Sequence, residues 1–271
     1  MQTDRLELGK KSAYINQYKP DLLYPIARKL KRNEIGIDEK NLPFCGQDIW
    51  NSYEVSWLNS KGKPIVKLAR FSFAADSKNI IESKSFKLYL NSFNNTKFSD
   101  EDKVIATLKE DLSRAAESDV KVELFGLMTT EPIVGLTGVC LDELDIECDE
   151  YMVNPNLLTT KSSHITETLY SDLLKSNCLV TNQPDWGSVY IHYQGPAIDQ
   201  ASLLRYIVSL REHNEFHEQC VERIFNDISR KCHPEKLCVE ARYTRRGGLD
   251  INPIRASHAE LLRPYQRLVR Q

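Results

Sequence analysis

The chain has 271 residues, and 41% of them are hydrophobic, which is enough to build a buried core and excludes a disordered chain. Its 36 basic and 38 acidic side chains leave a formal net charge of −2. A chain with this balance has no global field that attracts nucleic acid or an anionic membrane surface. Any anionic ligand must therefore be held by a local cluster of cations.

The chain also lacks the features of a membrane or secreted protein. No apolar run approaches the roughly 20 residues that a transmembrane helix needs, and the polar start Met1–Arg5 has no signal-peptide core. Seven cysteines, an odd number in a long chain, indicate reduced thiols. Cys232, His233 and Cys238 come nearest to a metal cluster, but their spacing matches no common zinc pattern. We therefore expect a cytoplasmic protein with no metal and no membrane partner.

The elements of the first half follow one another as strands, two helices and a last strand. The strands are rich in β-branched and aromatic residues, and Phe86, Leu90 and Phe93 recur at helical spacing in the first helix. The expected positions are strands over 53–58 and 65–73, a helix around 86–93, a helix over 101–115 and a strand over 120–127.

The second half repeats this order after a turn-forming join near 145–165. Residues 81–93 align without gaps to residues 198–210, and later matches keep nearly the same offset. We therefore expect two homologous halves, each an α+β unit with an antiparallel sheet, and the first 40 residues outside the repeat. Residues 24–28 should pack along the edge of one half. The second copy comprises a strand over 188–193, a helix capped by Asp199 with Leu203, Ile207 and Leu210, a helix over 217–231 and a strand over 237–243.

A cysteine, a turn and a carboxylate follow one another from Cys178 to Asp185. A nucleophile with a proton donor or acceptor nearby is typical of covalent catalysis. Seven extended residues would span roughly 23 Å, so the two groups meet only if the chain turns back at Asn182-Gln183-Pro184. A buried cysteine and a turn aspartate are the structural alternative, which the spacing by itself favours.

The segment Phe216-His217-Glu218 lies between the two helices of the second half. An aromatic ring offers a face for a flat heterocycle, and a carboxylate accepts hydrogen bonds from ring N–H and amino groups. An ordinary helix start, with Glu218 favouring the N-terminal dipole, explains the segment equally well.

Two basic clusters are candidates for binding phosphate. Lys84 and Lys87 lie in the first turn of a helix, and Arg245 and Arg246 precede the pair Gly247-Gly248. A solvated helix face and a basic turn are the structural alternatives. The chain contains no glycine-rich Rossmann or P-loop motif. Each half carries groups that its counterpart lacks, which indicates a composite site shared between the two copies.

Together these segments resemble the QueF family of NADPH-dependent 7-cyano-7-deazaguanine reductases, which act in queuosine biosynthesis. The resemblance runs in order over nearly the whole chain. It rests on Glu82-Ser83-Lys84-Ser85-Phe86-Lys87-Leu88-Tyr89, on Cys178 with Gln183-Pro184-Asp185, on Phe216-His217-Glu218, and, for the longer two-module form, on Pro43-Phe44, Gly46, Asp48, Trp50 and residues 53–59.

The resemblance implies an α+β fold of two tandem tunnelling-fold (T-fold) modules, each an antiparallel sheet with two helices on one face. Residues 1–150 would form the module with the Glu-Ser-Lys-Ser motif for NADPH and substrate, and residues 151–271 the module with the catalytic cysteine and aspartate. The family lacks the zinc chemistry of related T-fold enzymes. Chains associate through their sheets, so we expect a homodimer.

The resemblance also implies an activity, the reduction of a deazapurine nitrile to an aminomethyl group through a covalent thioimide, with two NADPH in sequence. The substrate is a small molecule, and no direct contact with nucleic acid is expected. The implied roles are Cys178 as nucleophile and Asp185 as proton donor; Ile81, Glu82, Ser83, His217 and Glu218 as substrate contacts; and Ser83, Lys84, Arg246 and Gly247 as NADPH contacts.

Two alternatives remain at this point. A cysteine hydrolase could use Cys178 with Glu82 and Lys84, and it would consume no NADPH. A non-enzymatic module could hold a purine-like or pterin-like base for a tRNA-modification complex, and it would not need the thiol of Cys178.

Overall fold

The computed structural model describes residues 14–129 and 131–271, so the polar start Met1–Arg5 lies outside the described residues. The chain divides into two compact units, each built from segments that are not contiguous in sequence. Within the described residues, no helix is long and apolar enough to cross a membrane. Unit 1 comprises Met1–Leu30, Asp48–Glu131 and Arg245–Asp250, and unit 2 comprises Lys31–Gln47, Pro132–Thr244 and Ile251–Gln271.

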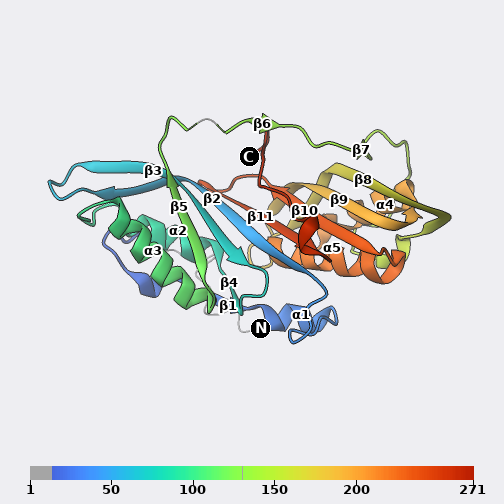
Figure 1. The fold of residues 1–271 in the computed structure, drawn as a ribbon, viewed down its shortest axis with the longest axis horizontal. Helices are drawn as coiled ribbons and strands as arrows, with labels where there is room; N and C mark the ends of the chain where they lie inside the picture. Colours follow the sequence, from blue (N-terminus) through green and yellow to red (C-terminus); the bar gives the residue numbers. More distant parts are fainter. Residues whose placement is uncertain (1–13, 130) are drawn as a thin grey trace. The chain divides into compact units, whose positions relative to one another are not determined.

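Unit 1 contains strands in the order β5-β3-β2, with helices on one face (Figure 1). Strand β3 pairs with β5 in antiparallel register, and α3 packs on β5. Residues 25–27, which were expected along the edge of one half, instead pair with β4 in a separate two-stranded antiparallel sheet. The bounds are β1 Pro25–Ala27, β2 Cys45–Leu58, β3 Pro64–Ala74, β4 Asn79–Ile81, α2 Ser83–Asn91, α3 Glu101–Ala116 and β5 Val120–Phe125.

The core of unit 1 is aromatic because α2 carries Phe86 and Tyr89 on the face that packs against the sheet. The ring of Phe86 meets Phe71 at 5.0 Å and Trp50 at 5.3 Å, both edge-on. Such pairs are favourable beyond the area that they bury. These side chains are almost completely buried, so they fix α2 against strands β2 and β3.

Unit 2 contains strands in the order β11-β10-β9-β8-β7, with α4 packed on β8 and α5 on β9 and β10 (Figure 1). The pairs β8–β9 and β9–β10 are antiparallel, whereas the short β7 pairs with β8 in parallel. The bounds are α1 Arg28–Glu34, β6 Ile133–Val134, β7 Val139–Cys140, β8 Thr160–Asn177, β9 Pro184–Ile198, α4 Gln200–Ser209, α5 His217–Cys232, β10 Lys236–Tyr243, β11 Leu249–Ala256 and β12 Arg267–Leu268.

The α+β class and the expected helices are confirmed, and the repeat extends to individual polar contacts. The hydroxyl of Tyr89 donates to Asp111 Oδ2 at 2.7 Å, and the hydroxyl of Tyr206 donates to Asp227 Oδ2 at the same distance. Asp199 caps α4 as predicted, with Oδ1 accepting from the amide of Ser202. The same tyrosine–aspartate hydrogen bond therefore joins α2 to α3 in the first half and α4 to α5 in the second.

The prediction that the first 40 residues stand outside the repeat is wrong for residues 19–24. The amide of Tyr24 donates to Ser85 Oγ at 3.0 Å, just as the amide of Thr159 donates to Ser202 Oγ at 3.1 Å. A 3₁₀ turn precedes each of these amides, over Pro20–Leu22 and Pro155–Leu157. The number of residues between this 3₁₀ turn and the helix that follows differs between the two copies. A search for a constant offset in the sequence therefore did not reveal the match.

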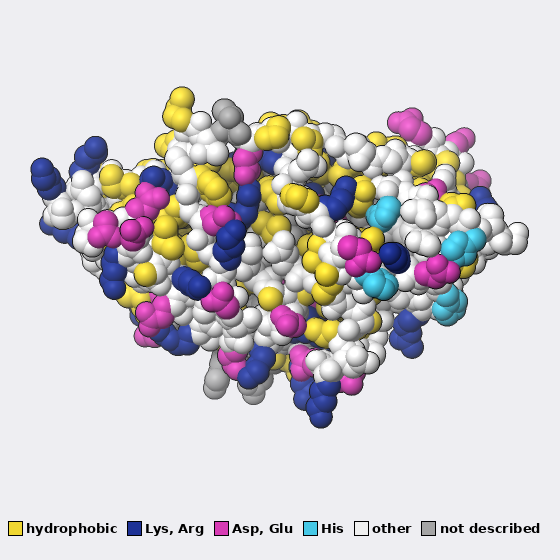
Figure 2. Space-filling view, in the orientation of Figure 1, with side chains coloured by type: hydrophobic (Ala, Val, Ile, Leu, Met, Phe, Trp, Pro, Cys, Tyr) yellow, Lys and Arg dark blue, Asp and Glu magenta, His cyan; other side chains and the backbone are white. Residues whose placement is uncertain are grey.

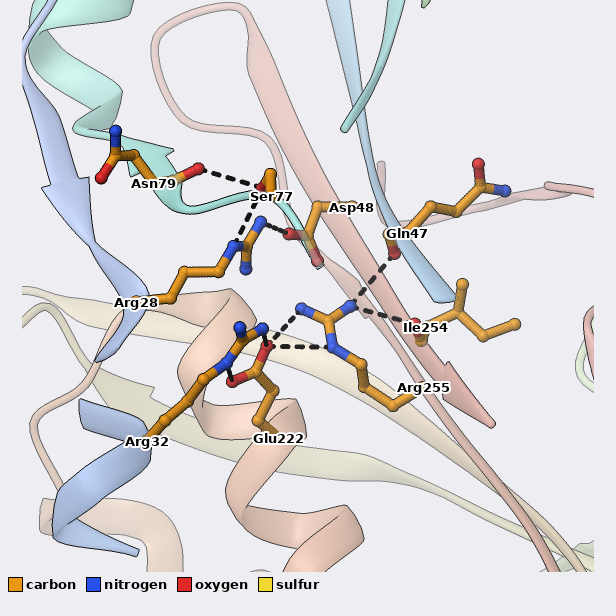
Figure 3. A network of polar contacts seen from close by, with 9 residues as sticks. All are labelled: Arg28, Arg32, Gln47, Asp48, Ser77, Asn79, Glu222, Ile254 and Arg255. Atoms are coloured by element: carbon orange, nitrogen blue, oxygen red, sulfur yellow. Dashed lines mark hydrogen bonds and ion pairs between the residues drawn. The ribbon is translucent and has the colours of Figure 1, made fainter. Parts of the chain in front are cut away.

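Buried ion pairs hold the segments of each unit together (Figure 3). In unit 1, Arg28 pairs with Asp48 at 2.5 Å and donates to Ser77 Oγ at 3.1 Å. In unit 2, Arg32 donates through two nitrogens to Glu222, at 2.7 and 2.9 Å. Arg255 donates to the same carboxylate at 2.8 Å.

A buried charge without a partner is strongly destabilising. The ion pairs of Glu222 therefore hold two segments against helix α5: helix α1 through Arg32, and strand β11 through Arg255. Glu222 lies in the interior of α5, five residues after His217.

Candidate active site

The hairpin between β8 and β9 presents the cysteine–aspartate segment. Strand β8 ends at Asn177, β9 begins at Pro184, and Ser176 lies opposite Asp185 in the antiparallel register. The amide of Cys178 donates to the carbonyl of Gln183 at 2.8 Å, and the amide of Asn182, with φ +56°, donates back to the carbonyl of Cys178 at 3.1 Å. The predicted reversal of the chain is confirmed.

Asp185 is held by a histidine from the start of α5. His217 Nε2 lies 3.3 Å from Asp185 Oδ2, and both side chains are largely buried. The imidazole stacks on Tyr243 of β10, with ring centroids 3.9 Å apart and planes 13° from parallel. Cys178 is 6% exposed and Asp185 4%. A thiol, a carboxyl group and an imidazole thus occupy one water-poor end of unit 2.

The first turn of α5 adds more buried polar groups. Phe216 occupies the N-cap position without a side-chain cap bond, and Glu218 follows in the first turn. Glu218 is 3% exposed, far less than a solvated helix-start residue would be. The neighbouring Gln219 is also buried, and neither end of its amide has a hydrogen-bond partner among the described residues. Sequence patterns gave no reason to select Gln219, because a lone amide in a helix carries no spacing signal.

Glu82 has a structural function in unit 1 in addition to its predicted one. Its carboxylate caps α2, with Oε1 accepting from the amide of Lys84 at 2.9 Å and Oε2 from the amide of Ser85 at 2.7 Å. Burial raises the pKa of Glu82, and the two amide hydrogen bonds oppose that rise. Ile81 immediately precedes it as the buried end of β4, and Ser83 begins α2.

The lysine helix and the arginine–glycine turn, which are far apart in sequence, come together within unit 1. Gly247 has φ +57°, and a Cβ there would lie 3.2 Å from the Cδ of Lys87. The amide of Arg246 closes the turn by donating to the carbonyl of Leu249 at 2.8 Å. The preceding residue, Arg245, places its guanidinium carbon 4.2 Å from the centroid of the Tyr53 ring. Glycine is thus favoured at position 247 by its backbone conformation, and a side chain there would press against Lys87.

Lys84, Lys87 and Arg246 form a cationic group that could bind an anionic ligand, with one change from the sequence prediction. The amides of Lys84 and Ser85 already donate to Glu82, so the helix start does not offer them to a phosphate. The side chains of Lys84, Lys87 and Arg246 would supply the positive charge instead, and Ser83 a hydroxyl. On the face drawn in Figure 2, basic and acidic side chains are interspersed.

The chain is similar to known proteins over nearly its whole length. Residues 14–124 match the family model described as nitrile reductase, 7-cyano-7-deazaguanine-reductase N-term, and residues 184–261 match the model described as QueF-like protein. A protein of Dechloromonas aromatica named NADPH-dependent 7-cyano-7-deazaguanine reductase is 59% identical over 92% of this chain and 89% of its own length. One of the same name from Hydrogenovibrio crunogenus is 56% identical over 99% of this chain and 97% of its own.

The chain belongs to the QueF family. In this QueF chain, the first matched range contains Glu82 and the start of α2, and the second contains Asp185, His217 and Glu218. Cys178 lies six residues before the second range. Neither matched range therefore contains Cys178, which the β8–β9 hairpin places just after the end of β8.

Proposed function

We propose that this chain uses NADPH to reduce the nitrile of 7-cyano-7-deazaguanine to an aminomethyl group, through a thioimide on Cys178. The observation that carries the proposal is the buried hairpin end, where Cys178 follows β8 and Asp185, near the start of β9, pairs with His217 of α5. Near-full-length relatives named for this reaction support it. The reaction belongs to queuosine tRNA-modification biosynthesis, and we propose a cytoplasmic location on that ground.

The chain's own groups perform the addition and the proton transfers. The thiolate of Cys178 forms a bond to the nitrile carbon, a π pair moves to nitrogen, and Asp185 gives that nitrogen a proton. NADPH, when bound, would supply hydride. A nitrile needs two hydrides and two protons to become an amine; Asp185 gives the first proton, and the second is taken up from solvent. Between the two reductions the carbon–sulfur bond breaks, which returns the thiolate to Cys178 and leaves an imine. His217 holds the carboxyl group in place, and the low exposure of the site protects the imine from hydrolysis.

We propose that one group of residues binds the deazaguanine and that another binds NADPH. Glu218 and Glu82 accept hydrogen bonds from the donor edge of the deazaguanine, with Ile81, Ser83 and His217 as further contacts. NADPH is bound by Ser83, Lys84, Arg246 and Gly247.

We also propose that the chain forms two tandem T-fold modules, residues 1–150 and 151–271, and assembles as a homodimer without contacting nucleic acid directly. The tyrosine–aspartate bonds and helix caps common to both halves support the two modules.

The function is tested by mixing the protein with 7-cyano-7-deazaguanine and NADPH and following nicotinamide absorbance. We expect two NADPH to be oxidised for each amine formed, because each hydride adds one electron pair to the former nitrile carbon. Disappearance of the nitrile without NADPH oxidation would indicate a cysteine hydrolase. Tight binding of the nitrile with no chemical change would indicate a base-holding module.

The cations beside the α2 start should determine the choice between NADPH and NADH. We expect Lys84→Ala and Arg246→Ala each to reduce the preference for NADPH by about tenfold, since a hydrogen bond to a charged group contributes roughly 1.5–3 kcal/mol. The measurement is the ratio of kcat/KM for the two cofactors. Lys109→Ala, on the exposed side of α3, is the matched control and should leave the ratio unchanged. Unchanged ratios in both site variants would place the 2′-phosphate elsewhere.

A further inference from the structure

A short loop before α5 lies directly beside the end of the nucleophile strand. The amide of Asn177 donates to the carbonyl of His213 at 2.8 Å, and the amide of Glu215 donates to the carbonyl of Asn177 at 3.0 Å. This pairing adds a parallel bridge between Asn177 and Asn214 at the point where β8 ends. The backbone before Cys178 is thus bound on both sides, by β9 and by this loop.

Asn214 reaches past the bridge to the turn itself. Its side-chain Nδ2 donates to the carbonyl of Cys178 at 3.1 Å and to Asn182 Oδ1 at 2.9 Å. One amide group therefore holds both ends of the turn that displays the thiol. Asn182 has a positive φ, which non-glycine residues adopt at a cost, so the bond to its side chain helps to maintain this conformation.

Glu215 fastens the same loop to helix α5. Its side chain is fully buried, and Arg223 donates to it through two nitrogens at 2.8 and 2.9 Å. His213 Nε2 lies 3.1 Å from the same carboxylate. Burial opposes the charged form, but the bonds from His213 and Arg223 outweigh it and lower the pKa of Glu215. The carboxylate is a rigid, fully paired link.

We infer that Asn214 and Glu215 are positioning residues that set the Cys178 thiol relative to the first turn of α5. The inference rests on the proposed function, in which Cys178 attacks a substrate held by that turn. The chain of contacts runs from Cys178 through Asn214 and Glu215 to Arg223, and α5 carries His217 and Glu218 at its start. A nucleophile displaced by about 1 Å can lose on the order of a hundredfold in rate.

The test separates bond formation from binding. We expect Asn214→Ala and Glu215→Gln to slow thioimide formation by about tenfold to a hundredfold, measured by intact mass against time, with saturating nitrile and no NADPH. The dissociation constant, measured calorimetrically in a Cys178→Ala background, should stay near its unmutated value. Glu222→Gln is the matched control, because Glu222 is an equally buried, arginine-paired carboxylate of unit 2. It should lower the melting temperature and leave the rate of adduct formation near wild type.

An unchanged adduct rate in Asn214→Ala would overturn the inference, and so would an equal slowing in Glu222→Gln, which would indicate general destabilisation. Alkylation of Cys178 by iodoacetamide, followed by peptide mass mapping, gives a readout that needs no nitrile. If the wild type forms no nitrile adduct, the proposed function fails. A rate of Cys178 alkylation that changes in the two variants but not in Glu222→Gln would then still support the positioning role.

Discussion

Replacing Cys178 with alanine is expected to abolish both the covalent adduct and the reduction of the nitrile. A nitrile carbon accepts hydride poorly until a nucleophile has added to it, and the buried hairpin end offers Cys178 for that addition. Incubation of the wild type with 7-cyano-7-deazaguanine alone should increase the intact mass by one substrate. The variant should show no added mass and no NADPH oxidation.

Cys232→Ala provides the matched control for this experiment. Cys232 is also buried in unit 2, at the end of α5, and burial raises the pKa of its thiol to about 11. It should therefore remain a protonated, unreactive thiol at neutral pH. We expect Cys232→Ala to form the adduct as the wild type does. An adduct that persists in Cys178→Ala would refute the assignment of the nucleophile.

Glu218→Gln is expected to weaken substrate binding by about tenfold to a hundredfold, since losing one charged hydrogen-bond partner costs roughly 1.5–3 kcal/mol. The deazaguanine presents a ring N–H and an amino group along one edge, and a carboxylate accepts from both, whereas an amide presents a donor of its own. Glu218 is almost completely buried, which makes an unpaired group there costly. Calorimetric titration with the nitrile substrate measures the change.

The competing explanation is that Glu218 only favours the N-terminal dipole of α5. That role would lower the melting temperature and leave affinity intact. Glu101→Gln is the comparison, because Glu101 occupies the first turn of α3. We expect a near-unchanged melting temperature in Glu218→Gln together with weakened binding. Wild-type affinity in Glu218→Gln would identify this residue as a helix-start group only. Glu82 also has a proposed contact with the base, so partial binding should remain.

Local patterns in the sequence were enough to predict helices α2 to α5 and strands β2, β3, β5, β9 and β10, whereas the long strand β8 (Thr160–Asn177) was not predicted. Apolar residues at helical spacing predicted the first helix of each half, the predicted ranges of the second helices match α3 and α5 to within a residue at the ends, and Asp199 was identified as the cap of α4. The turn at Asn182-Gln183-Pro184 was predictable for the same reason. Helix periodicity, capping and turn chemistry act between residues within a few positions of one another, so a single sequence displays them.

The contacts that surround the candidate site were decided only by the tertiary structure. Nothing near Asn214 in the sequence indicates that its amide meets the carbonyl of Cys178, 36 residues earlier. The contact of Lys87 with Gly247 likewise joins two segments of unit 1 that lie far apart in the sequence. Glu82 was predicted to contact the substrate, but its function as the cap of α2 requires a helix start whose φ and ψ only the structure provides.

The composition and motifs of this chain by themselves determined its α+β class, the repeated order of elements, and its resemblance to the QueF family. The tertiary structure decided which buried groups have partners: Asp185 with His217, Glu215 with Arg223, and Glu222 with two arginines. Such pairing depends on strand register and helix packing between distant segments. A shift of one residue in β9 would turn Asp185 to the other face of the sheet, although every local pattern in the sequence would remain the same.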